Sequence, residues 1–440
     1  MAILVEYTMQ LILILTVWVV RLITVLLKLS GKGRGTALPG LLVERYFPSQ
    51  IPYILNKSPY TILITGTNGK TSTRTFLVNI LEQKHKVISN KSGSNMLRGI
   101  ISEILTQTNL LGSVNAKLAV FEVEEATISK LSGLLKPEQI IITNLFRDQL
   151  DAYGEIDRTQ KFIQEAINNS PQAKVVLNGD DPKVVELDTS KCNAVSYVHI
   201  NDELITKFKY EGSGVIHEDT TDLVATNLEI LSDLSTKFIW SNNTTHLKLP
   251  GYFQIYNALL AISCAKELGF NTTEINSGIE NTTAPFGRGE LVKRDNTNYR
   301  IFLIKNPAGF NLTLDLLTHV QNPSIAIILN DKIADGRDVS WIWDSELEIL
   351  NDFKPKYIFC SGTRVEDILL RVKYAYPDLQ KQGTNTYFSK INQTTVTIDF
   401  TQEELLKRIA AQNIDEVFVL ATYTSMLKLR KLLTGNSLNV

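Results

Sequence analysis

The feature that most constrains this chain is one short turn, Gly66-Thr67-Asn68-Gly69-Lys70-Thr71. The apolar, β-branched run before it, residues 60–65, predicts a buried strand, and the apolar residues after it recur at helical spacing. At a strand–turn–helix junction, backbone N–H groups and the helix N-terminus can meet phosphate oxygens. Lys70 can reach the outer phosphates of a nucleotide, and the Thr71 hydroxyl can bind Mg²⁺. We therefore predict a nucleotide-binding loop. An ordinary glycine-rich turn is the alternative, because the glycine spacing is shorter than in G-x-x-x-x-G-K-[ST].

Buried-strand patterns alternate with helical patterns through the first half of the chain. Further strands are predicted at residues 118–123, 139–145 and 175–178, and residues 97–106 show a helical pattern. This alternation predicts an α/β fold built on a doubly wound parallel sheet. Residues 205–250 contain short β-type runs, which suggest a small antiparallel insertion in this domain.

A second α/β unit, Rossmann-like in its pattern, is predicted in the last third of the chain. Its strands are expected at residues 300–304, 324–329, 357–360 and 416–420, and its helices include residues 365–375 and 403–412. The chain is therefore expected to divide into an apolar N-terminal helix (1–30), a linker (31–56), a central nucleotide-binding domain (57–298) and a C-terminal α/β domain (299–440).

Composition excludes several classes of protein. The chain has 440 residues, with 45 Lys and Arg against 46 Asp and Glu. This balance argues against a mainly electrostatic grip on nucleic acid. The three cysteines, Cys192, Cys264 and Cys360, form no CxxC pair, so neither a disulfide framework nor a cysteine zinc site is expected.

The N-terminal segment from Leu11 to Leu27 is apolar and lies at the short end of the range for a membrane-spanning helix. Arg21 lies within it, where a charge is costly at mid-bilayer. Basic residues follow the segment, and by the positive-inside rule they would place its C-terminal side in the cytoplasm. A spanning anchor and an apolar helix that packs on the protein or lies in the membrane interface both remain open.

Several motifs resemble those of the Mur ligases, the ATP-dependent enzymes that build peptidoglycan stem peptides. In family order they are TGTNGKTST (65–73), VFEVEEA (120–126), TNLFRDQLD (143–151), LNGDDP (177–182), YNALLA (256–261) and FGRGE (286–290). Other segments resemble the MurT subunits of lipid II isoglutaminyl synthase in particular. They are GTALPG (35–40), SGSNMLRG (92–99), KNPAGFN (305–311), DGRDVSWIWD (335–344) and ATYTSML (421–427).

The MurT resemblance implies an amidation at the cytoplasmic face of the bacterial membrane. The α-carboxylate of the stem D-glutamate in lipid II would be activated with ATP as an acyl phosphate, and ammonia would then give D-isoglutamine. A GatD-like glutaminase, as a separate subunit, would supply the ammonia. Two alternatives remain open: a Mur-type ligase that adds an amino acid, and a catalytically idle nucleotide-binding scaffold.

The resemblance also assigns roles to single residues. Thr71 and Glu122 would hold Mg²⁺, a hard cation that prefers oxygen ligands, and Glu122 is thereby counted among the catalytic residues. Asn257 would contact adenine and Arg288 the phosphates. Asn178 and Asp181 either line the nucleotide pocket or form a turn.

Asp335, Asp338 and Asp344 form an acidic segment in the C-terminal domain. In MurT an Asp of this domain is thought to complete the Cys–His pair of the partner glutaminase, and a carboxylate that orients a histidine follows general triad logic. Asp344 is favoured for this role. The Asp335 and Asp338 pair could instead form a structural turn or contact substrate, and Asp344 could simply be solvated.

The chain departs from the family pattern at several points. Many MurT chains carry a four-cysteine zinc ribbon in the central domain, whereas the central domain of this chain has only Cys192 and Cys264, so no zinc ribbon is predicted. Gln149 stands where ordinary Mur ligases have a metal-binding histidine, and no match for their carbamylated lysine is found; both departures fit ammonia better than an amino acid as the nucleophile. Cys360 is expected to be a buried strand cysteine rather than a glutaminase nucleophile, because no histidine lies in a recognisable partner motif.

Overall fold

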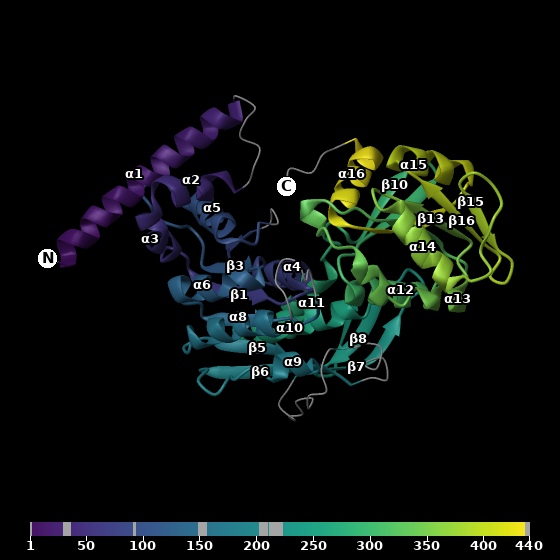
Figure 1. The fold of residues 1–440 in the computed structure, drawn as a ribbon. Helices are drawn as coiled ribbons and strands as arrows, with labels where there is room; N and C mark the ends of the chain where they lie inside the picture. Colours follow the sequence, from purple (N-terminus) through teal and green to yellow (C-terminus); the bar gives the residue numbers. More distant parts are fainter. Residues whose placement is uncertain are drawn as a thin grey trace.

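The structure, a computed structural model, describes residues 2–29, 37–90, 94–147, 156–201, 210 and 223–435. Gln149 and the end of its motif, the glycine run at 31–36, Ser92-Gly93 and most of residues 202–222 lie outside the described residues. Two α/β units follow one another along the chain, and a long N-terminal helix lies along the outer side of the first (Figure 1). The α/β fold predicted from the alternating patterns is confirmed.

The first unit is built on a nine-stranded sheet in the order β2-β3-β1-β4-β5-β6-β7-β8-β9. The strands from β2 to β7 pair in parallel, and β7, β8 and β9 pair antiparallel. Their bounds are β1 Tyr60–Thr65, β2 Val87–Ser89, β3 Leu118–Glu122, β4 Gln139–Ile142, β5 Lys174–Asn178, β6 Ala194–Ile200, β7 Leu223–Ile230, β8 Thr236–Trp240 and β9 Asn243–Leu247. The strands expected to form an insertion therefore extend the edge of the main sheet.

Helices cover both faces of this sheet, so apolar side chains from each strand are buried on either side. One face is covered by α4 (Lys70–Leu81), α10 (Phe253–Glu267) and α11 (Thr272–Glu280). The other is covered by α1 (Ala2–Leu29), α2 (Leu38–Tyr46), α3 (Ile51–Leu55), α5 (Leu97–Gln107), α6 (Glu125–Leu135) and α8 (Ile156–Asn168). The described residues of this unit also form two short helices, η1 (Pro48–Gln50) and α9 (Pro182–Val185).

The segment expected to be a linker, residues 31–56, instead contributes α2, η1 and α3 to the helical layer. Gly40, which lies within the predicted linker, instead allows close packing between two helices. A Cβ at this position would lie 1.8 Å from the carbonyl oxygen of Arg98, and the Gly40 amide donates to Ser102 Oγ over 2.7 Å. The glycine thus allows α2 to approach α5.

The second unit has an eight-stranded sheet in the order β10-β11-β17-β12-β13-β16-β15-β14. Its strands are β10 Arg288–Arg294, β11 Thr297–Leu303, β12 Ser324–Ile328, β13 Tyr357–Ser361, β14 Gln380–Lys381, β15 Thr386–Ser389, β16 Thr394–Asp399 and β17 Glu416–Ala421. The five strands from β11 to β16 are parallel, and antiparallel strands close both edges. Because β10 pairs with β11, this sheet begins at Arg288, ahead of the boundary expected at residue 299.

Helices also cover both faces of the second sheet. They are α12 (Pro307–Leu317), α13 (Leu350–Phe353), α14 (Val365–Ala375), α15 (Gln402–Ala411) and α16 (Tyr423–Thr434), with the short turns η3 (Ile333–Asp335), η4 (Ser340–Asp344) and η5 (Leu347–Ile349) after β12. In a parallel sheet the carboxyl ends of the strands meet at one edge, which is where an open α/β fold places its ligands.

Candidate nucleotide site

The turn between β1 and α4 has the backbone that its two glycines permit. Gly66 has φ 121° and Gly69 has φ 89°, both in the left-handed region. A Cβ at residue 69 would lie 2.1 Å from Asn257 Oδ1. Gly69 is therefore required both for the turn and for the close approach of α10.

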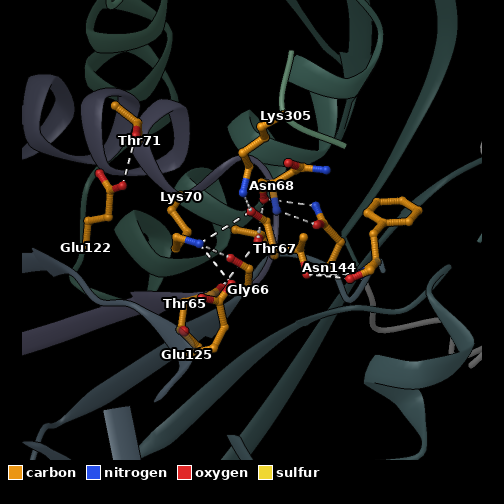
Figure 2. Close-up of polar contacts among 12 residues, drawn as sticks. Thr65, Gly66, Thr67, Asn68, Lys70, Thr71, Glu122, Glu125, Asn144 and Lys305 are labelled. Carbon is orange, nitrogen blue, oxygen red and sulfur yellow. Dashed lines mark hydrogen bonds and ion pairs between the residues drawn. The ribbon is translucent and has the colours of Figure 1, made fainter. Parts of the chain in front are cut away.

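The end of β4 supports this turn from the side. The Thr67 amide donates to the carbonyl oxygen of Asn144 over 2.9 Å, and the Asn68 amide donates to Asn144 Oδ1 over 2.8 Å (Figure 2). Thr143 Oγ1 donates to the carbonyl oxygen of Asn68 over 2.6 Å. The Thr143-Asn144 pair of the TNLFRDQLD motif thus fixes the shape of the loop, a role that the sequence analysis did not assign.

Lys70 lies at the start of α4, and its ammonium group is held within the loop. Nζ donates to the carbonyl oxygens of Gly66 and Thr67, the latter over 3.4 Å, and forms an ion pair with Glu125 Oε1 at 2.9 Å. Both charged side chains are largely buried. Glu125, the first residue of α6, was not predicted as a site residue; its only signal was its place in the VFEVEEA motif.

Thr71 and Glu122 lie together, as a shared metal site requires. Thr71 Oγ1 donates to Glu122 Oε1 over 2.9 Å (Figure 2). Oxygen ligands in adjacent positions of an octahedral Mg²⁺ site lie about 3 Å apart, so this pair fits the ion. Arg74 Nε lies 3.5 Å from the second carboxylate oxygen of Glu122. Within the described part of the chain, no cluster of three or more His, Cys, Asp or Glu side chains could hold a metal.

A pocket opens beside the loop. Its lining includes Asn68, Gly69, Asn257 and Arg288, so four of the predicted nucleotide-binding residues meet in one place. Asn257 accepts a hydrogen bond from Thr73 Oγ1 over 3.3 Å.

Arg288 is the charged residue of this pocket. It is half-buried, and among the described residues none forms a hydrogen bond or an ion pair with its guanidinium group. Burial lowers the pKa of the guanidinium, and the negative charge of Glu122 partly offsets this effect. A desolvated cation on the pocket wall favours an anionic ligand such as phosphate.

Aromatic side chains form another part of the pocket wall, namely Phe146, Tyr210, Phe253, Tyr256 and Phe302. The rings of Phe146 and Tyr210 stack with centroids 5.3 Å apart and planes 10° apart. Tyr256 donates to Asp180 Oδ2 over 2.7 Å, which fixes its ring. Flat apolar walls with a few polar groups suit a planar base.

Asn178 and Asp181 do not line this pocket. Asp181 accepts hydrogen bonds from the amides of Leu145, Lys183 and Val184 and so caps α9, which supports the turn interpretation. Burial raises the pKa of its carboxyl group to about 7. Asn178 Nδ2 donates to Tyr210 Oη over 3.0 Å, so its contribution to the pocket is indirect.

The loop after β11 crosses from the second unit to the phosphate loop. Lys305 Nζ donates to the carbonyl oxygen of Thr67 over 3.1 Å (Figure 2), and the side-chain amides of Asn68 and Asn306 contact each other at 3.3 and 3.4 Å. Asn306 also caps α12 by accepting from the Gly309 amide over 2.9 Å. The KNPAGFN motif was recognised in the sequence, but its contact with the loop was not predicted.

The three acidic residues of the C-terminal domain differ in environment, and none lines the pocket. Asp335 is buried and accepts from the Thr424 amide and hydroxyl over 2.7 and 2.5 Å at the start of α16. Asp338 accepts from the Ser340 amide and hydroxyl, which lower the pKa of its carboxyl group. Asp344 is exposed, and its carboxylate makes no hydrogen bond or ion pair with any described residue.

Cys360 lies in β13 and is fully buried. Burial raises the pKa of its thiol to about 12, so the thiol is neutral at physiological pH. This environment agrees with the interpretation of Cys360 as a core residue.

Comparison with known proteins agrees with the sequence motifs. Residues 64–265 match the Mur ligase middle domain, and residues 303–426 match the MurT ligase C-terminal domain. The chain is 32% identical to the lipid II isoglutaminyl synthase (glutamine-hydrolyzing) subunit MurT of Streptococcus pneumoniae, over 93% of this chain and 95% of the relative. It is also 32% identical to the Staphylococcus aureus subunit of the same name, over 78% of this chain and 83% of the relative.

Solved structures show the same fold at lower identity. MurF from Acinetobacter baumannii superposes with a TM-score of 0.66 at 18% identity, covering 91% of this chain and 80% of that one. MurF from Thermotoga maritima, solved in complex with ADP, gives a TM-score of 0.64 at 17% identity, covering 88% and 82%. The chain belongs to the MurT family of Mur ligase-type proteins.

Proposed function

We propose that this chain is the ligase subunit of a lipid II isoglutaminyl synthase, which amidates the α-carboxylate of the stem D-glutamate in lipid II at the expense of ATP. The observation that carries the proposal is the convergence of Gly69, Asn257 and Arg288 on one pocket beside the phosphate loop. The similarity to MurT subunits over nearly the whole chain supports the choice of substrate.

The first step is transfer of the γ-phosphoryl group. A carboxylate oxygen of the substrate attacks the γ-phosphorus, the bond to the β,γ-bridging oxygen breaks, and ADP leaves. Lys70 and Arg288 place positive charge beside the phosphates, and the loop backbone fixes their position. Thr71 and Glu122 would hold Mg²⁺, which when bound neutralises phosphate charge.

The second step is attack of ammonia on the carbonyl carbon of the acyl phosphate. The C–O bond to phosphate breaks, inorganic phosphate leaves, and the nitrogen loses a proton to give the amide. Ammonia is a small neutral nucleophile, so the site needs no pocket for a second amino acid.

A GatD-like glutaminase would supply the ammonia and dock on the C-terminal domain near Asp344. This carboxylate is exposed and unpaired among the described residues, as a group donated to a partner's histidine must be. Beside it, the exposed rings of Trp343 and Tyr374 meet edge to face with centroids 5.2 Å apart. Exposed Trp and Tyr side chains are typical of the energetic centres of protein interfaces.

The site of action would be the cytoplasmic face of the membrane, where ATP and a lipid-linked substrate meet. One helix among the described residues, over Thr8–Leu26, is long and apolar enough to cross a membrane. It supports membrane association by length and composition.

Amidation assays with lipid II, ATP and Mg²⁺ test the proposal. With ammonium as nitrogen source, the wild-type chain should form amidated lipid II, and Lys70→Ala should abolish it while Lys407→Ala, on the exposed face of α15, should not. No amidation by the wild-type chain, with ammonium or with the partner and glutamine, would refute the function. Release of ADP that depends on an added amino acid would favour the amino-acid-adding alternative.

The role of Asp344 is tested with the partner present. Asp344→Asn should lose glutamine-driven amidation and keep ammonium-driven amidation. Asp338→Asn is the matched control, because it removes a charge from the same segment, and it should keep both. Equal loss of both nitrogen sources in Asp344→Asn would contradict the assignment.

A further inference from the structure

The N-terminal helix α1 has two faces with different environments. On one face Leu13, Val17 and Val20 are each only 1% exposed, and they pack in the core cluster that includes α2, α3 and α5. The middle of α1 is therefore packed into the core of the first unit.

Polar contacts hold the same region in place. The Arg21 guanidinium donates to the carbonyl oxygens of Leu105, Thr106 and Thr108 at the C-terminal end of α5. A cation at this end of a helix satisfies carbonyl groups that have no intrahelical partner. Trp18 Nε1 donates to the carbonyl oxygen of Leu110 over 2.9 Å.

The opposite face of α1 is a continuous apolar stripe. Its members recur at spacings of three and four residues, and each is more than half exposed: Leu11 62%, Leu15 64%, Trp18 55%, Leu22 61% and Leu26 56%. The Trp18 contact places the loop of Leu110 (50%) and Leu111 (72%) beside the stripe. Soluble proteins rarely expose so many large apolar side chains in one patch.

Charge along the N-terminal segment favours an anionic lipid surface as the occupant. Between residues 1 and 36 Glu6 is the only acidic residue, whereas the basic residues are Arg21, Lys28, Lys32 and Arg34. Basic residues that flank an apolar helix face are attracted to anionic headgroups. Two parallel copies of the same segment would instead bring these like charges together.

We propose that α1 lies in the plane of an anionic membrane surface, with the stripe and Leu110-Leu111 inserted at the headgroup boundary and the opposite face held on the domain. To span the bilayer instead, α1 would have to leave the domain core and carry Arg21 away from its three carbonyls into hydrocarbon. The membrane binding itself is argued independently of the proposed function. Only its biological role rests on that function: it would hold the nucleotide site close to a lipid-linked substrate.

Vesicle flotation of the full chain tests the proposal. The wild-type chain should float with vesicles of phosphatidylglycerol and phosphatidylcholine, and more weakly with phosphatidylcholine alone. Leu15→Glu combined with Leu22→Glu should reduce binding at least tenfold. Ile391→Glu is the matched control, because Ile391 is exposed in the other unit, and it should bind like the wild type. Absence of wild-type binding, or equal binding by the double variant, would overturn the proposal.

The orientation of α1 needs a second measurement. With a protease site added before Met1, cleavage in inside-out membrane vesicles should occur without detergent, because an in-plane helix leaves its N-terminus on the cytoplasmic side. Protection until detergent is added would show a spanning helix. A wild-type dimer that becomes monomeric in the double variant, with no vesicle binding, would show that the stripe binds a second copy of the chain. Either this result or protection of the protease site would overturn the proposal.

Amidation of detergent-dispersed lipid II separates this inference from the proposed function. The double variant should keep wild-type kcat there, since no residue of the stripe lines the pocket. A chain that floats but does not amidate refutes the function alone, and one that amidates but does not float refutes the membrane inference alone.

Discussion

Lys305 of the second unit donates a hydrogen bond to the carbonyl oxygen of Thr67 in the phosphate loop, over 3.1 Å. Lys70 Nζ reaches the same oxygen at 3.4 Å. Two ammonium groups, one from each unit, thus converge on one atom of the loop. Their combined positive charge lies where the outer phosphates of a nucleotide are expected.

Lys305→Ala should lower kcat/KM for ATP about tenfold, equivalent to about 1.4 kcal/mol of transition-state stabilisation. The physical reason is the loss of a cation beside the transferring phosphoryl group. Steady-state amidation with ammonium measures the effect, and Lys407→Ala on α15 controls for the loss of a lysine. Unchanged kcat/KM would mean that the contact serves only the packing of the two units.

Glu125→Gln should destabilise the nucleotide-free protein, because Lys70 would keep its buried charge without a carboxylate partner. Leaving a buried charged group poorly satisfied costs about 1–3 kcal/mol. Saturating Mg-ATP should reduce this loss of stability relative to the wild type, since the phosphates give Lys70 a new anionic partner. Thermal unfolding with and without nucleotide measures this, and a deficit that is the same in both conditions would contradict the role given to Lys70.

Thr71→Val should raise the Mg²⁺ concentration needed for half-maximal activity by roughly tenfold or more, because a methyl group replaces a ligand oxygen. Thr71→Ser keeps the hydroxyl and should behave like the wild type. A magnesium titration of ATP-dependent amidation gives the comparison. Equal titrations for the two variants would exclude Thr71 as a ligand.

Asp181 should make stability fall as pH rises. Its pKa is about 7 in the folded chain, above the ordinary 3.8, so between these values the folded state binds more protons than the unfolded state. The free energy of unfolding of the wild type, relative to Asp181→Asn, should therefore decrease by about 2 kcal/mol from pH 5 to pH 7 and level off above the folded pKa. Denaturant unfolding at several pH values measures this difference, and parallel curves would contradict it.

Local patterns predicted most of the fold. The strand at Tyr60–Thr65 and the helix at Val365–Ala375 lie where their apolar spacing placed them, because each buries its own apolar residues against a neighbouring layer. The predicted helix at residues 403–412 is α15, shifted by one residue. Residues 37–56 were misinterpreted, because Pro39 and Gly40 are typical of loops and only the contact with α5 explains a glycine there.

The sequence could indicate a candidate site only where its residues follow one another in the chain. The phosphate loop is one continuous segment, and its function depends on local backbone geometry. The contact of Lys305 with Thr67 joins residues 238 positions apart, so no spacing in the sequence could indicate it. Glu125 was missed for a similar reason, because its partner Lys70 lies 55 positions away.

Arg288 is the first residue of β10, and Lys305 follows the end of β11, with which β10 forms an antiparallel hairpin in which Arg288 pairs with Phe302. Both cations are therefore carried by one hairpin at the edge of the second sheet. A tilt of that sheet, such as a docked partner could impose, would move the two charges together relative to the phosphate loop. Through this hairpin, the position of the second sheet would control how close the two cations lie to the nucleotide phosphates.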